Sequence, residues 1–187
     1  MRIIAGEYRG RLLKTLRGRG LRPTSDRLRE TLFNILGAAV SGAVFLDCYA
    51  GSGAVALEAL SRGASQAFCI EAAPAAQRLI RQNADSLGVG ESLRLVPMQV
   101  SRGLRKLDEQ GVRAQFCFFD PPYALLPEAL RSVAWLAASS LMLPHGLIIV
   151  EHSRRDATPE RAASWARTRL LQQGSSVLSF YRKDQEG

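Results

Sequence analysis

The stretch AVFLDCYAGSG, residues 43–53, decides the fold. An apolar, strand-like run at residues 43–47 passes directly into a loop that contains Gly51 and Gly53, and a helical pattern begins at Ala54. Glycines permit a tight turn and let a ligand approach the bare backbone, while N–H groups at the start of a helix attract electronegative atoms. The stretch therefore predicts an α/β unit that binds a ligand on this loop.

The same alternation of short apolar runs and amphipathic helices continues along the chain. We expect strands at residues 43–47, 66–71, 92–96, 115–119 and 146–151, and helices at 54–62, 73–87, 101–109 and 127–141. Strands separated by helices are typical of a parallel, doubly wound sheet. Beyond Pro159 we expect a helix around 160–165 and an antiparallel hairpin of residues 169–173 and 176–182, split by Gly174. The expected fold is α/β, with seven mostly parallel strands.

Composition limits the class of protein. The 187 residues are 47% hydrophobic and 22% charged, which suffices for one domain with a full core. The start of the chain has no apolar signal segment and no stretch reaches the length of a membrane span, so we expect a cytosolic protein. We also expect a monomer. Cys48, Cys69 and Cys117 form no C-x-x-C pair and fall in or at the ends of expected strands, so neither a metal site nor a disulfide framework is indicated.

Positive charge is concentrated in the first thirty residues. The chain has 25 Lys and Arg against 17 Asp and Glu, a net charge of +8, and residues 1–30 hold nine basic and three acidic residues of that balance. Such a charge favours an anionic partner such as nucleic acid. Short apolar pairs and Tyr8 between the arginines indicate an ordered hairpin or arm rather than a solvated leader, and Arg9 and Arg11 suit bidentate recognition of phosphate.

A helix is predicted directly after this basic segment. Thr24 or Ser25 can act as its N-cap, apolar residues then recur at helical spacing, and Gly37 ends it. Arg22 and Arg27 lie at its start and can project toward the same face as the arm.

A second motif, Asp120-Pro121-Pro122-Tyr123, follows the apolar run at residues 115–119. In open α/β folds the carboxyl ends of strands are where ligands bind. The prolines have no N–H and fixed φ angles, so backbone carbonyls and the Asp120 carboxylate can face a pocket as acceptors, while Tyr123 can stack on a flat ring. The motif suits a planar substrate with an exocyclic amine, although a plain strand followed by a Pro-Pro turn has the same pattern.

The order of acid and glycines in the first loop favours a cationic cofactor over NAD. Ala56 stands where a dinucleotide fingerprint has its third glycine, and Asp47 precedes the glycines, where it opposes a pyrophosphate but can pair with the ammonium of a methionine-type group. Glu71, at the end of the second strand, can take both hydroxyls of a ribose, although a surface acid is common at such a place. Gln99, in the turn after the third strand, can read the edge of an adenine.

Together the two motifs resemble class I S-adenosylmethionine-dependent methyltransferases that act on exocyclic amino groups. Further segments narrow the resemblance to the bacterial 16S ribosomal RNA guanine-N2 methyltransferase family: RIIAG at 2–6, RGR at 9–11, RPTSDRLRE at 22–30, LEALSRGA at 57–64 and FYR at 180–182. The resemblance covers nearly the whole chain. It departs from the family at Cys48-Tyr49, where a bulkier apolar pair is usual, and at the turn of residues 97–99.

The resemblance implies a Rossmann-like methyltransferase fold, S-adenosylmethionine as cofactor, and methyl transfer to N2 of one guanine. It implies these cofactor-binding residues: Asp47, Ala50, Gly51, Gly53, Glu71 and Gln99. It implies these catalytic residues: Asp120, Pro121, Pro122 and Tyr123. It implies these RNA-binding residues: Arg9, Arg11, Arg22 and Arg27. The sulfonium methyl would point toward Asp120, and a flipped guanine would enter beside Tyr123.

The resemblance also implies a partner and a division of the chain. The substrate would be 16S ribosomal RNA, within a partly or fully assembled small ribosomal subunit. Residues 1–36 would form a basic arm and helix that face the RNA, and residues 37–187 would form one compact catalytic domain.

Three other functions remain open from the sequence. DNA adenine and protein glutamine N-methyltransferases use similar Pro-Pro-Tyr pockets, although a DNA enzyme needs a target-reading domain for which 187 residues leave little room. A non-catalytic RNA-binding assembly factor is the third alternative. A cofactor loop together with an amine-binding motif argues against it.

Overall fold

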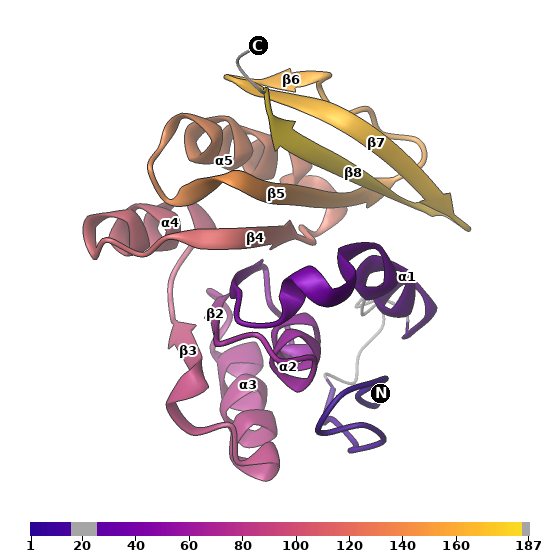
Figure 1. Cartoon of the computed structure of the whole chain (residues 1–187), viewed down its shortest axis with the longest axis vertical. Coiled ribbons are helices and arrows are strands. Elements are labelled where there is room, and N and C mark those ends of the chain that lie inside the picture. The colour runs from indigo at the N-terminus through magenta and orange to yellow at the C-terminus, as the bar shows by residue number, and fades with distance from the viewer. Residues whose placement is uncertain (16–25, 185–187) are drawn as a thin grey trace. The chain divides into compact units, whose positions relative to one another are not determined.

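The computed structural model describes residues 1–15 and 26–184. The chain divides into two compact units, Met1–Gln99 and Val100–Gly187 (Figure 1). The predicted N-cap at Thr24 or Ser25 lies outside the described residues, as does Arg22.

The first unit contains a parallel sheet in the order β3-β2-β1. Its strands are β1 (Val44–Cys48), β2 (Gln66–Ile70) and β3 (Leu93–Val96). Its helices are α1 (Asp26–Leu36), α2 (Ala54–Ser61) and α3 (Pro74–Leu87), with short 3-10 turns η1 (Gly37–Val40) and η2 (Gly90–Ser92). The last four residues of β1 and of β2 are all buried, as expected where helices cover a parallel sheet.

Residues 1–15, here called the arm, form the ordered hairpin that the sequence predicts. Arg2 and Leu12 form an antiparallel bridge, the Ile3 N–H donates to the Arg11 carbonyl at 3.0 Å, and the Gly10 N–H donates to the Ile3 carbonyl at 2.9 Å. The Ile3 side chain is completely buried. The arm therefore belongs to the core of the first unit on one side.

Glu58 of α2 anchors the arm. Its carboxylate, completely buried, accepts the N–H groups of Ile4 at 2.8 Å and Ala5 at 3.1 Å. Arg62 Nε donates to the same carboxylate at 2.8 Å, and Nε of the buried Arg29 lies 3.6 Å from it. Two cations and two backbone donors thus neutralise and satisfy an acid that would otherwise be costly to bury.

Two further side chains fix the arm. Ser61 donates its hydroxyl to the Ala5 carbonyl at 2.6 Å and accepts the Tyr8 N–H at 3.0 Å. Asn83 of α3 accepts the Lys14 N–H at 2.8 Å and donates to the Lys14 carbonyl at 3.0 Å, so its amide pairs with backbone as a neighbouring strand would.

The second unit contains five strands in the order β4-β5-β8-β7-β6. They are β4 (Ala114–Phe119), β5 (Met142–Ser153), β6 (Arg161–Ala162), β7 (Trp165–Gln173) and β8 (Ser176–Lys183). The helices are α4 (Val100–Glu109) and α5 (Leu126–Ala138), with the 3-10 turn η3 (Tyr123–Leu125). The strands β4 and β5 pair in parallel, whereas β5, β8 and β7 run side by side as antiparallel neighbours (Figure 1).

The prediction of seven strands and of a helix around residues 160–165 is wrong. The described residues form eight strands, because β6 and the start of β7 make a tight antiparallel hairpin in which Ala162 faces Trp165. Ala163 in the turn has φ of 50°, a left-handed conformation that no helix contains. Buried residues three positions apart indicate a helix in the sequence, but here the turn between two strands produces that spacing.

A buried polar chain ties the loop after β5 to β8. The Ser179 hydroxyl lies 2.8 Å from both His152 Nε2 and the Thr158 hydroxyl, and Arg167 Nη1 donates to the Thr158 hydroxyl at 3.1 Å. Burial lowers the pKa of His152 from its ordinary value. A neutral imidazole can accept the Ser179 hydroxyl, which closes the chain of hydrogen bonds.

Replacing Gly6 by Ala should release the arm. Gly6 has φ of 87°, and a Cβ there would stand 1.7 Å from the Ser61 carbonyl oxygen. Gly10, with φ of 82° and open space around it, is a matched control for backbone strain alone, which costs about 1–2 kcal/mol. We expect Gly6→Ala to lower the free energy of unfolding by about 1.5–3 kcal/mol more than Gly10→Ala, since Ile3 loses its burial. Denaturant titration measures this, and equal losses in the two variants would contradict the anchoring.

Candidate active site

The loop between β1 and α2 is held in a conformation that needs glycine. Gly51 has φ of 56° and Gly53 has φ of 77°, and Tyr49 has φ of 63° although it is not a glycine. The N–H groups of Tyr49 and Ala50 both donate to the Ile70 carbonyl at the end of β2, at 3.1 and 3.3 Å. The end of β2 therefore helps to fix the conformation of the loop that follows β1.

The two glycines meet different surroundings. A Cβ on Gly53 would stand 3.4 Å from the Ile80 side chain and 3.7 Å from the Cys69 sulfur, so Gly53 packs onto the interior. A Cβ on Gly51 would meet only the Tyr49 carbonyl, at 4.0 Å, so the backbone at Gly51 is open to a ligand. Burial, followed by the charges of Asp47 and Glu71, raises the pKa of Cys69 well above its ordinary value, and its thiol stays neutral.

Glu71 lies directly against this loop. Its Oε2 accepts the Gly51 N–H at 2.9 Å and its Oε1 accepts the Ala73 N–H at 2.7 Å. A carboxylate oxygen can accept more than one hydrogen bond, so both oxygens can also take ribose hydroxyls. The residues present thus fit a ribose beside a glycine loop.

Asp47 is placed differently from the simplest expectation. Its side chain is buried, and Oδ2 accepts the Ala56 N–H at 3.0 Å in the first turn of α2. This contact fixes the start of the helix relative to β1. Direct contact of Asp47 with a cofactor stays a prediction, as does contact of Ala50. Gln99 is exposed between β3 and α4, and its contact with adenine also stays a prediction.

The Asp120–Tyr123 motif belongs to the second unit, where it follows β4 as predicted. Asp120 is half-buried and Pro121 is buried, whereas the Tyr123 side chain is 63% exposed. The Leu125 N–H donates to the Pro122 carbonyl at 2.7 Å and so turns the chain into η3. The geometry leaves the Tyr123 ring accessible for stacking.

The predicted RNA-binding arginines differ in their contacts within the protein. Arg9 and Arg27 are exposed, and their side chains form no hydrogen bond or ion pair within residues 1–15 and 26–184. Arg11 donates through Nη2 to the Ser86 carbonyl at 2.5 Å, so it helps to hold the arm on the end of α3.

Sequence reasoning missed the residues that position the arm. Glu58, Ser61 and Asn83 make contacts across more than fifty positions of the chain. One signal was visible in the sequence: Glu58 is the only charged residue in the apolar stretch AVALEALS, residues 54–61, and a buried helix tolerates an acid only with partners. The structure brings Asp47, Gly51 and Glu71 together in the first unit.

Comparison with known proteins assigns the family. The family model described as Conserved hypothetical protein 95 matches residues 1–182. Ribosomal RNA small subunit methyltransferase D of Escherichia coli K12 is 37% identical over 192 residues, covering 100% of this chain and 92% of that protein. The chain belongs to the ribosomal RNA small subunit methyltransferase D family. The member from Haemophilus influenzae is 33% identical over 182 residues, covering 96% of this chain and 91% of its own.

Solved structures agree with this family. The candidate methyltransferase yhhF of Escherichia coli has a TM-score of 0.83 at 34% identity, with 98% of both chains covered. A hypothetical protein of Thermus thermophilus has a TM-score of 0.82 at 33% identity, with 97% of this chain and 99% of that chain covered. The α/β methyltransferase fold and the family resemblance predicted from the sequence are confirmed.

Residues 1–15 and 26–184 contain neither a cluster of metal ligands nor a membrane-spanning helix. No three His, Cys, Asp or Glu side chains are grouped as a metal ion would need. No helix in these ranges combines the length and the apolar character required to cross a bilayer.

Replacing Glu71 by Ala, or Gly51 by Val, should weaken binding of S-adenosylmethionine. Each hydrogen bond to a charged group contributes about 1.5–3 kcal/mol, so the loss of the two predicted ribose contacts at Glu71 should raise Kd by about a hundredfold or more. Gly88→Val is the matched control, since Gly88 also has positive φ, 69°, in open space. Titration calorimetry measures the three affinities, and wild-type affinity in Glu71→Ala and Gly51→Val would place the cofactor elsewhere.

Proposed function

We propose that this chain transfers a methyl group from S-adenosylmethionine to the exocyclic N2 of a specific guanine in 16S ribosomal RNA. Membership of the ribosomal RNA small subunit methyltransferase D family supports the reaction and the RNA substrate. The observation that carries the proposal in the structure is the Glu71 carboxylate fixed against the open backbone of Gly51. That pairing fits a ribose and disfavours a pyrophosphate.

The cofactor supplies a methyl group on a sulfonium, which makes it both cationic and reactive. Glu71 holds the ribose hydroxyls, and the open backbone at Gly51 and the exposed Gln99 accommodate the rest of the nucleoside. Asp47 acts by fixing α2 and the loop, and its negative charge favours the ammonium end. These residues all belong to the first unit.

The second unit orients the acceptor base. The N2 amine of guanine is a poor nucleophile because its lone pair is delocalised into the ring. The Asp120 carboxylate and the Pro121 carbonyl accept its two N–H groups. These hydrogen bonds orient the amine so that its lone pair is less delocalised into the ring. The exposed Tyr123 ring stacks on the flipped base. Positioning of this kind supplies most of the acceleration in a transfer between two bound groups.

The arm and the start of α1 hold the RNA backbone. The arm is docked by buried hydrogen bonds, so its cations are presented on a rigid surface rather than on a loose leader. Arg9 and Arg27 are exposed there. A short arm reads little sequence, so specificity comes largely from the shape of a folded RNA, and a partly or fully assembled small ribosomal subunit in the cytoplasm is the natural substrate.

Incubation with labelled S-adenosylmethionine tests the reaction. Small-subunit particles, naked 16S RNA, DNA and protein are offered separately, and nucleosides and peptides are then identified by mass spectrometry. We expect N2-methylguanosine from the ribosomal substrates alone. Label on adenine or on glutamine would replace this proposal with one of the two related enzyme classes.

Replacing Asp120 by Ala should abolish transfer while leaving cofactor affinity intact. A lost acceptor that acts chiefly in the transition state lowers kcat rather than binding, here by about a hundredfold or more. Single-turnover methylation of subunit particles measures the rate, and calorimetry with S-adenosylmethionine provides the control. An unchanged rate in Asp120→Ala would remove this residue from the mechanism.

Replacing Arg9 and Arg27 together by Gln should weaken RNA binding and its salt dependence. Each phosphate neutralised contributes about −0.7 to −0.9 to the slope of log affinity against log salt, so the slope should flatten by roughly 1.5 units. Arg78→Gln with Arg81→Gln on α3 removes the same charge from exposed positions and serves as the control. An equal effect of both pairs would indicate a general charge effect instead of a binding face.

A further inference from the structure

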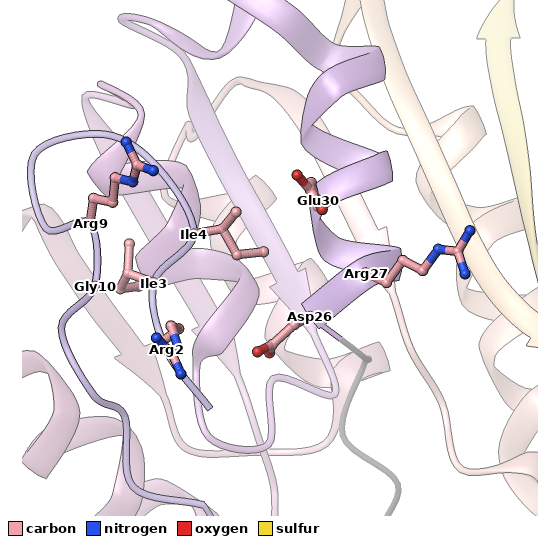
Figure 2. A pocket seen from close by; sticks show the side chains of 8 residues that line it. All are labelled: Arg2, Ile3, Ile4, Arg9, Gly10, Asp26, Arg27 and Glu30. Atoms are coloured by element: carbon pink, nitrogen blue, oxygen red, sulfur yellow. The ribbon is translucent and has the colours of Figure 1, made fainter.

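A groove of about 460 Å³ separates the arm from α1 in the first unit (Figure 2). Arg2, Ile4 and Arg9 line it on the arm, and Asp26, Arg27 and Glu30 line it on α1. In Figure 2 the carboxylates of Asp26 and Glu30 point toward the arm, and the Ile4 side chain points toward α1. The arm wall thus carries two cations and the apolar Ile4 side chain, and the α1 wall carries two acids together with Arg27.

Most of these charges are unused inside the protein. Arg2, Arg9 and Glu30 are exposed, and their side chains make no hydrogen bond or ion pair with any residue that the structure describes. These three charges are therefore available to a ligand.

Buried Arg29 sets the distance between the walls. Its Nη2 donates to the Arg2 carbonyl at 2.5 Å and to Asp26 Oδ1 at 3.1 Å, so one guanidinium joins the arm to α1. Arg29 is completely buried and rests against the Glu58 carboxylate. The groove is therefore built on the same charged cluster that anchors the arm.

Facing cations and acids select a particular kind of ligand. A purely basic groove suits any polyanion, but Glu30 repels a phosphate that approaches its wall. A nucleotide satisfies both walls, because its phosphates pair with arginines while N–H groups on its base donate to a carboxylate. The Ile4 side chain offers an apolar surface to the face of the base.

Guanine matches a single carboxylate better than the other bases. Its Watson–Crick edge carries two adjacent donors, N1–H and the N2 amine, which fit the two oxygens of one carboxylate. Adenine and cytosine place an acceptor nitrogen beside their amine, and uracil places carbonyls beside its N–H. An acid facing any of these three meets an acceptor.

We propose that this groove binds a second guanine of the RNA substrate, distinct from the one that is methylated. Glu30 reads its N1–H and N2 edge, and Arg2 and Arg9 hold its phosphates. The inference rests on the proposed function, since it takes the substrate to be RNA. It adds direct sequence selectivity, which phosphate contacts alone do not give.

Binding of short labelled RNAs tests the inference. The probes are uridine pentamers with a central guanosine or a central inosine, which differs from guanosine only by lacking the N2 amine. Asp120→Ala with Tyr123→Ala forms the background, so that the target site does not bind the single guanine. At one fixed salt concentration we expect a preference for guanosine of about tenfold, the discrimination typical of a bidentate contact.

Adding Glu30→Gln should reduce that preference to about one, because an amide presents a donor to the donors of guanine. Glu91→Gln, at an exposed acid of the same unit outside the groove, should keep it. The inference is overturned if the ratio of guanosine to inosine affinity is near one while Glu30 is still present. It is also overturned if the preference for guanosine survives Glu30→Gln. If Glu30→Gln strengthens both probes equally, the groove is a plain phosphate track and the inference also fails.

Methylation of subunit particles separates the two proposals. Glu30→Gln should raise KM severalfold and leave kcat unchanged, since Glu30 is placed in recognition only. If the wild type methylates the particles but the pentamer assay shows no preference for guanosine over inosine, only the groove proposal is overturned. If the wild type transfers no methyl group to ribosomal RNA, the proposed function is overturned.

Discussion

The first unit depends on the buried carboxylate of Glu58. A lone buried acid costs several kcal/mol, and here Arg29, Arg62 and two backbone N–H groups of the arm compensate it. Because Gly53 is the N-cap of α2, the helix that anchors the arm directly follows the glycine loop. Two turns of helix therefore couple the position of the basic surface to that of the ligand loop.

Asn83 makes the same connection by a shorter route. Its side-chain amide pairs with the backbone of Lys14 in the arm, and Nδ2 also donates to the Ser52 carbonyl in the loop at 2.9 Å. Satisfied networks of buried polar groups specify one arrangement and resist small displacements. In the first unit, Asn83 thus links the arm to the glycine loop, and the proposed RNA-binding surface and the proposed cofactor loop share one hydrogen-bonded support.

Local pattern was enough to predict the elements that carry their own signal. β1, β2 and β4 read as buried apolar runs, and Glu71 and Gly51 proved to be neighbours, because parallel strands end at one edge. The hairpin of β6 and β7 was not predicted, since the turn at Ala163 places buried residues at the spacing expected of a helix. The docking of the arm was not predicted either, because the Ile4–Glu58 contact joins residues 54 positions apart. The use of Arg11 within the fold has no local signature either.

The clamp formed by Glu71 has a consequence for turnover. Ribose is common to the methyl donor and to the demethylated nucleoside left after transfer, so a carboxylate that grips ribose holds both equally. Such uniform binding does not distinguish reactant from transition state and does not raise kcat. In the proposed mode of binding, the same two oxygens that fix the Gly51 loop hold the spent cofactor as well as the fresh one, and product inhibition is expected. In that arrangement the rate of cofactor exchange depends partly on the backbone of Gly51, because Gly51 orients the Glu71 carboxylate.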